Sequence, residues 1–155
     1  MKKTKMAVLA AGACTLAILA GCTPMHAQPL PVVSGPHASV TLYREGAYNA
    51  GAMPMIFGEA DRDYVEIYNA NFWKFDVAPG EHTFFVRSNQ ADQPFTLKST
   101  LVADQSLCLT GYANPNNYLK ALTGGIAYLL GNTFLLKEAS CPTGEELKKY
   151  TQAGQ

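Results

Sequence analysis

The feature that most constrains the fold is a pair of alternating segments on either side of Ala78-Pro79-Gly80-Glu81. Apolar and aromatic side chains occupy every second position in residues 72–77 and again in residues 82–87, which is the period of a β-strand. Pro presets φ and Gly allows a positive φ, so the connection predicts a type II turn and a β-hairpin. The side chains that share one face of each segment are Trp73, Phe75, Val77, His82, Phe84 and Val86.

Aromatic residues also lie on the opposite faces, at Phe72 and Phe85. We therefore expect the hairpin to be central and covered on both sides, with its rings in the core. The alternative is an exposed aromatic platform that binds carbohydrate.

Other short alternating or apolar runs extend the same pattern along residues 38–142. They predict an all-β domain, a single antiparallel β-sandwich of about seven or eight strands. Residues 53–57 are an expected strand that includes Pro54. Because proline cannot donate to a sheet, this strand is expected to lie at a sheet edge or to start near Pro54. Residues 118–131 fit either a helix or a bent hairpin, because Gly124 and Gly125 interrupt a helical pattern. The remaining expected strands are residues 38–44, 64–68, 95–101, 106–111 and 132–139.

Residues 143–155 are expected to form a short helix and a frayed tail. Thr143 and Glu146 have the spacing of a capping box, and Lys148 and Lys149 suit the negative end of a helix.

The N-terminus has the pattern of a signal peptide over residues 1–21. Lys2, Lys3 and Lys5 precede an uncharged apolar run, which ends at Leu19-Ala20-Gly21-Cys22. This tetrapeptide resembles the lipobox of bacterial lipoproteins, in which the cysteine receives palmitate-type acyl chains and becomes the first mature residue. The alternatives are an ordinary secretory signal and a retained anchor helix.

The lipobox resemblance implies membrane attachment through Cys22. In bacteria that sort lipoproteins, an Asp after the cysteine often implies inner-membrane retention, and this chain has Thr23. The resemblance therefore implies the outer membrane, facing the periplasm. Residues 22–37 are expected to be a Pro-rich tether that extends roughly 45 Å and lifts the domain off the bilayer. We expect His26 and His37, which lie in it, to be solvated.

Charge and cysteine content narrow the class of protein. Three of the twelve basic residues precede Met6, so the rest of the chain has nine basic and twelve acidic residues. The sequence has no cluster of Lys and Arg in that part, so we do not expect nucleic acid as a partner. Of four cysteines, Cys14 leaves with the signal and Cys22 is the lipidation site. Cys108 and Cys141 then form an even pair in an oxidising compartment. A disulfide between them would close a loop of about 30 residues and stabilise by roughly 3 kcal/mol; the alternative is two buried thiols.

Several segments resemble a bacterial lipoprotein family known as domain of unknown function 2846. The resemblance spans residues 38–139, and the Pro-Gly turn is its most specific part. It implies no catalytic residues, because the family has none established. The matching segments are Tyr43-Arg44-Glu45, Phe72-Trp73-Lys74-Phe75-Asp76-Val77, Ala78-Pro79-Gly80-Glu81-His82-Thr83 and Leu135-Leu136-Lys137-Glu138-Ala139.

Few residues suggest chemistry. His82 is the only histidine of the expected domain, and a serine triad through His82 and Asp76 is one hypothesis, although no serine has a GxSxG context. Asp61, Asp63 and Glu66 offer carboxylates for calcium, yet the spacing of an EF-hand loop is absent. We expect no metal and no cofactor.

We therefore expect a non-catalytic envelope protein that presents a β-sandwich for protein contacts or serves an envelope assembly. Residues 53–57 are a candidate edge strand for a partner strand. The second hypothesis is a module that binds a small ligand or glycan, and an enzyme is the third. The ligand-binding hypothesis would use Tyr48, Tyr64, Tyr68 and Tyr112.

Overall fold

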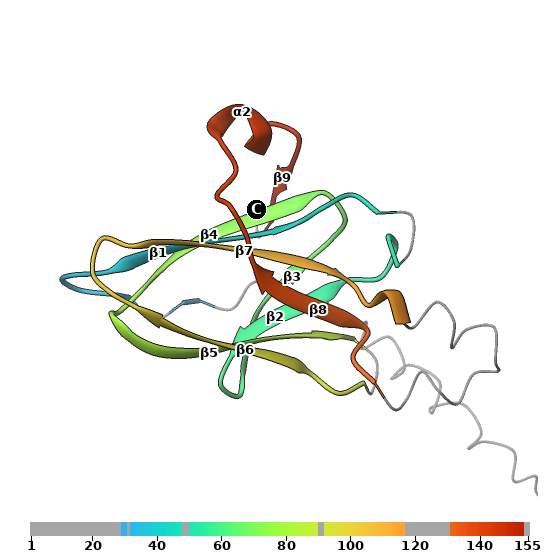
Figure 1. Ribbon diagram of the computed structural model, residues 1–155, viewed down its shortest axis with the longest axis horizontal. Coiled ribbons are helices and arrows are strands. Elements are labelled where there is room, and N and C mark those ends of the chain that lie inside the picture. The colour runs from blue at the N-terminus through green and yellow to red at the C-terminus, as the bar shows by residue number, and fades with distance from the viewer. Residues whose placement is uncertain (1–28, 31, 48–49, 90–91, 117–130, 154–155) are drawn as a thin grey trace, which may run out of the picture.

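The computed structural model describes residues 29–30, 32–47, 50–89, 92–116 and 131–153. These residues form an all-β sandwich of two sheets, which confirms the expected fold class. Figure 1 shows the two layers, with β1, β4 and β7 in one and β5 and β6 in the other. The signal peptide, Cys22, Tyr48 and nearly all of residues 118–131 lie outside the described residues. No helix within the described ranges has the length and hydrophobicity to span a membrane.

The first sheet has the order β8-β7-β1-β4-β9. β1 pairs antiparallel with β4 and parallel with β7, while β9 pairs with the start of β4. Its strands are β1 (Ala38–Arg44), β4 (Asn71–Val77), β7 (Ser106–Ala113), β8 (Phe134–Glu138) and β9 (Thr151–Gln152).

The second sheet has the order β3-β2-β5-β6, and all its pairs are antiparallel. Its strands are β2 (Met55–Glu59), β3 (Arg62–Ile67), β5 (Gly80–Ser88) and β6 (Phe95–Leu101). The short helix α2 (Gly144–Leu147) lies on the outer side of the first sheet in Figure 1.

Aromatic rings from both sheets fill the space between them. Trp73 and Phe75 of β4 are 7% and 6% exposed, and Phe84 of β5 is fully buried. Phe57 lies within 6.3 Å of all three rings, measured between ring centroids. Core packing is therefore confirmed for these side chains, and the exposed carbohydrate platform was a wrong alternative.

The predicted hairpin of residues 72–87 is wrong. β4 pairs with β1 in the first sheet, whereas β5 pairs with β2 and β6 in the second. The Ala78-Pro79-Gly80 segment carries the chain across the sandwich, with Gly80 at a φ of 145°. An alternating pattern fixes which side chains face inward, but it does not say which strands exchange hydrogen bonds.

The prediction that residues 53–57 form an edge strand is also wrong. β2 begins at Met55, directly after Pro54, and lies between β3 and β5. Both of its sides are therefore paired, and it cannot accept a partner strand. Ile56 and Phe57 are buried on opposite faces, which is typical of an internal strand.

The C-terminal segment covers the outer face of the first sheet. Thr143 and Glu146 form the predicted capping box at α2. Cys108 of β7 and Cys141 form the predicted disulfide, with 5.0 Å between their Cα atoms. The tail expected to fray instead forms β9, because Thr151 N–H donates to Ala70 O at 2.8 Å and Ala153 N–H donates to Phe72 O at 2.7 Å.

Arg44 ends β1 as a buried cation, which the sequence analysis did not anticipate. Its side chain is 2% exposed and donates to the carbonyl oxygens of Ala50 (2.5 Å), Met53 (2.7 Å) and Ile67 (3.2 Å). The guanidinium carbon lies 4.7 Å from the ring centroid of Phe134. Burial lowers the pKa of Arg44 to about 10, so the side chain is still charged at neutral pH.

Candidate functional site

A cavity lies where the edges of the two sheets meet. Among the described residues, β9 covers only Asn71 and Phe72 of β4, so the rest of β4 is an outer edge of its sheet. β3 is the outer strand of the other sheet. Between these edges a cavity of about 340 Å³ is lined by β4, the corner after it and parts of β2, β3 and β5.

The chain before β1 forms the remaining side of this cavity. Leu30, Val32, Val33 and Ser34 line it, and we call these four residues the tether wall. Leu30 packs against the hydrophobic core. The expectation that residues 22–37 form a free spacer is therefore wrong for this part, because an apolar side chain finds a buried partner on the domain. His37 remains exposed, as expected.

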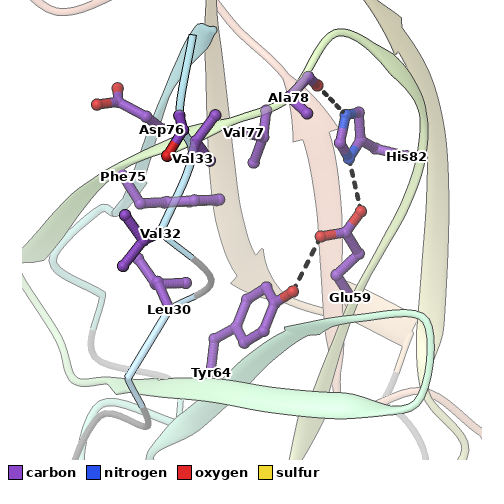
Figure 2. A pocket seen from close by; sticks show the side chains of 11 residues that line it. Leu30, Val32, Val33, Glu59, Tyr64, Phe75, Asp76, Val77, Ala78 and His82 are labelled. Carbon is purple, nitrogen blue, oxygen red and sulfur yellow. Dashed lines mark hydrogen bonds and ion pairs between the residues drawn. The ribbon is translucent and has the colours of Figure 1, made fainter.

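Most of the cavity surface is apolar. Phe75 and Val77 of β4 face the tether wall. In Figure 2, Leu30, Val32 and Val33 lie on one side of the cavity, and the polar side chains of Glu59 and His82 lie on the other. Val32 is 92% exposed at the rim.

The polar end of the cavity is a chain of three side chains (Figure 2). His82 Nδ1 lies 2.5 Å from Glu59 Oε1, and Tyr64 Oη donates to Glu59 Oε2 at 3.0 Å. His82 Nε2 lies 2.8 Å from the carbonyl oxygen of Ala78. When both ring nitrogens carry hydrogen, each donates to one acceptor and His82 and Glu59 form an ion pair.

Strand geometry explains how these residues meet. His82 is two positions before Phe84 on the inward face of β5, and the two rings stack with centroids 5.5 Å apart. Glu59 pairs with Phe84 in the register of β2 and β5. In β3, Val65 pairs with Phe57 and Asp63 with Gly58, so Tyr64 is the extra residue of a β-bulge. A bulge re-aims a side chain, and here it turns Tyr64 toward the cavity.

Gly58 permits the bulge. A Cβ atom at this position would collide with the carbonyl oxygen of Arg62 and with the Phe85 ring. The close approach of β3 to β2 that places Tyr64 beside Glu59 therefore depends on a residue without a side chain.

The predicted triad partner of His82 is wrong. Asp76 points away from His82, accepts from Ser39 Oγ at 2.8 Å and lies 4.0 Å from His37 Nε2. Glu59 takes the place that the sequence analysis assigned to Asp76. Because His82 Nε2 donates a hydrogen bond to the Ala78 carbonyl oxygen, that nitrogen is not available to accept a proton from a hydroxyl nucleophile. The geometry thus suits the recognition of a ligand better than acid–base catalysis.

The candidate calcium ligands are engaged separately. Asp63 forms an ion pair with Arg87 at 2.5 Å, and Glu66 accepts from Tyr68 Oη at 3.1 Å. Asp61 is exposed in the turn between β2 and β3. No group of three His, Cys, Asp or Glu side chains that could hold a metal ion occurs in the described part of the chain.

Of the tyrosines named for ligand binding, Tyr64 lines the cavity, whereas Tyr68 and Tyr112 do not. Tyr68 is 45% exposed after β3, and Tyr112 lies under Lys137 on the first sheet. Glu59 and the tether wall were not predicted from the sequence. Glu59 could have been found, since it is two residues after the inward-facing Phe57.

Comparison with known proteins places this chain in no group. No family model, no curated protein and no solved structure matches it. The resemblance to domain of unknown function 2846 therefore stays an expectation.

The Tyr64 side chain is expected to ionise at a higher pH than a solvated tyrosine does. Burial, the charge of Glu59 and the hydrogen bond to Glu59 raise the pKa of Tyr64 from 10.0 to about 12. The neutral phenol therefore stabilises the fold fully below pH 10.0, and this contribution is lost as the pH rises through about 12. Phenolate absorbance during an alkaline titration, compared between the wild type and Tyr64→Phe, measures this pKa.

The Glu59→Gln variant is the control for the cause. It should lower the pKa of Tyr64 but leave it above 10.0, because burial is the largest cause and persists. A wild-type midpoint for Tyr64 at 10.0 would contradict the buried contact with Glu59.

Proposed function

We propose that this chain is a lipid-anchored protein of the bacterial envelope, with a non-catalytic β-sandwich that makes protein contacts or serves an envelope assembly. The observation that carries the proposal is Leu19-Ala20-Gly21-Cys22 after a charged start and an apolar run. The disulfide between Cys108 and Cys141 supports it, since such bonds persist in oxidising compartments such as the periplasm. Thr23 favours the outer membrane, facing the periplasm.

Acylation explains how such a chain stays at a membrane. Each buried methylene contributes about 0.8 kcal/mol, and one acyl chain holds a protein only marginally. Two or three chains on Cys22 would make dissociation negligible. Since Leu30 packs on the domain, the chain between Cys22 and Leu30 can span at most about 30 Å, which keeps the sandwich near the bilayer.

The cavity favours a second candidate function, a lipoprotein that binds a small ligand. Its support is an apolar concave surface that ends in the His82–Glu59–Tyr64 chain, since ligand sites combine apolar walls with a few convergent polar groups. Both functions are compatible, because the anchor and the cavity lie in different parts of the chain.

Replacing Cys22 by Ala is expected to abolish incorporation of radiolabelled palmitate and to leave the precursor uncleaved by the lipoprotein signal peptidase. The reason is that the thiol is the only group of the motif that can carry the lipid. Gel autoradiography of labelled cells, with membrane fractionation, measures both effects.

Cys14→Ala is the matched control, because Cys14 lies in the same leader and should leave labelling unchanged. Continued labelling of the Cys22→Ala variant would reject the proposed anchor.

A further inference from the structure

The shape and lining of the cavity indicate the body of its ligand. A volume of about 340 Å³ is within the range of small-molecule sites, roughly 300–1,000 Å³. Leu30, Val33, Phe75 and Val77 offer an apolar surface on two sides. Val32 is 92% exposed at the rim, so an apolar body in the cavity would cover a side chain that otherwise faces water.

The charges of the cavity indicate the head of its ligand. The Glu59 carboxylate lies at its polar end, whereas the Asp76 carboxylate points away from it, and among the described lining residues there is no Lys or Arg. His82 is the one basic group, and both of its ring nitrogens already lie against acceptors. An anionic head group would therefore meet the Glu59 carboxylate, and the ring nitrogens of His82 would not be available to donate to it.

Glu59 has acceptor capacity to spare. Each carboxylate oxygen has two acceptor sites, and His82 and Tyr64 occupy one site on each oxygen. Glu59 is held from both sides, with only 20% of its side chain exposed, so it presents a fixed acceptor at the end of an apolar cavity. A ligand that donates a hydrogen bond would complete this group.

We propose that the cavity between the tether wall and the β3–β4 edges binds a small amphipathic amine, with an apolar body against Phe75 and Val77 and an ammonium head on Glu59. This inference deepens the second candidate function and does not depend on lipidation of Cys22. The ligand lies between the chain that leads to the anchor and the sandwich, and its apolar body packs against both.

Photolabelling of the full chain in phosphatidylcholine nanodiscs tests the proposal. The probe is decylamine with a diazirine in its alkyl chain, and the matched probe is decanoic acid with the same diazirine. The amine should label peptides that contain Val33 or Phe75, identified by mass spectrometry, and the acid should label them at least about tenfold less. Equal labelling by the two probes would overturn the proposal.

Two variants locate the site. Glu59→Gln should raise the amine concentration needed for half-maximal labelling roughly tenfold, because it removes a charged hydrogen-bond acceptor. Glu66→Gln is the control, since Glu66 accepts from Tyr68 and does not line the cavity. Unchanged labelling of Glu59→Gln would reject the head-group contact.

Val33→Trp tests the cavity without altering a strand. The larger side chain on the tether wall should fill the cavity and remove most labelling, whereas Val102→Trp, at a position that is 63% exposed and outside the cavity, should not. Full labelling of a folded Val33→Trp variant would place the amine elsewhere and overturn the proposal. The palmitate assay on Cys22 is independent, so failure of the anchor and failure of the cavity site are distinguishable.

Discussion

Replacing Arg44 by Ala is expected to lower the free energy of unfolding by about 3–5 kcal/mol. The substitution removes the donors for the carbonyl oxygens of Ala50, Met53 and Ile67 and leaves a cavity beside Phe134. Urea unfolding followed by tryptophan fluorescence measures this loss, because the chain has one tryptophan and it is buried in the core.

Two further variants separate the causes. Arg44→Met keeps much of the packing against Phe134 but provides no donors, so most of the loss should persist. Arg62→Ala is the matched control, because Arg62 is exposed and its guanidinium carbon lies 6.0 Å from the ring centroid of Tyr64. We expect it to change stability by less than about 1 kcal/mol. If Arg44→Ala behaved like Arg62→Ala, the buried carbonyl network would not contribute as inferred.

The position of Arg44 shows what alternation predicts and what it leaves open. Val40 and Leu42 occupy alternate positions of β1, so they share one face, and both are fully buried. The same period places Arg44 on that face, but its burial was not predicted, because an arginine is rarely buried without partners. The partners were not predicted either, because they are main-chain carbonyls of a loop and of β3, whose positions no sequence pattern specifies.

The pairing between strands was harder to predict from the sequence than the strands themselves. Residues 72–77 and 82–87 were recognised as strands, although β5 begins earlier, at Gly80, and Trp73, Phe75 and Phe84 were placed correctly in the core. The Pro-Gly turn suggested that they pair with each other, whereas they face each other across the sandwich. Both arrangements bury the same side chains, so the alternating pattern does not distinguish them.

The candidate site could be predicted only in part. His82 was identified as the one domain histidine, but its partner was sought at Asp76, six residues away in sequence. The actual partner, Glu59, comes from another strand, and Tyr64 reaches Glu59 only because of the bulge at Gly58. A bulge shifts the register by one residue, and no alternating pattern in residues 62–67 indicates where it falls.

Loss of the disulfide is expected to have the second large effect on the stability of the fold. Replacing Cys108 and Cys141 together by Ser should lower the free energy of unfolding by about 3–4 kcal/mol, the loop-closure value for a separation of 33 residues. The bond joins β7 to the chain that leads into α2 and β9, and that chain places Tyr150 against Tyr43, with ring centroids 5.7 Å apart. Urea unfolding of the double variant and of the wild type measures the difference.

Reduction provides the control for this variant. A reductant should lower the stability of the wild type to slightly above that of the double variant and leave the variant unchanged, since both then lack the same cross-link. Serine is close to cysteine in size, so the substitution itself should contribute little beyond the lost bond at Cys141, which is exposed. Cys108 is 3% exposed, and a hydroxyl there adds a buried polar group, so the variant should be slightly less stable than the reduced wild type. Equal urea midpoints for the oxidised and reduced wild type would show that the two cysteines are not joined in the folded chain, and the outer layer of the first sheet would then depend on α2 and β9 alone.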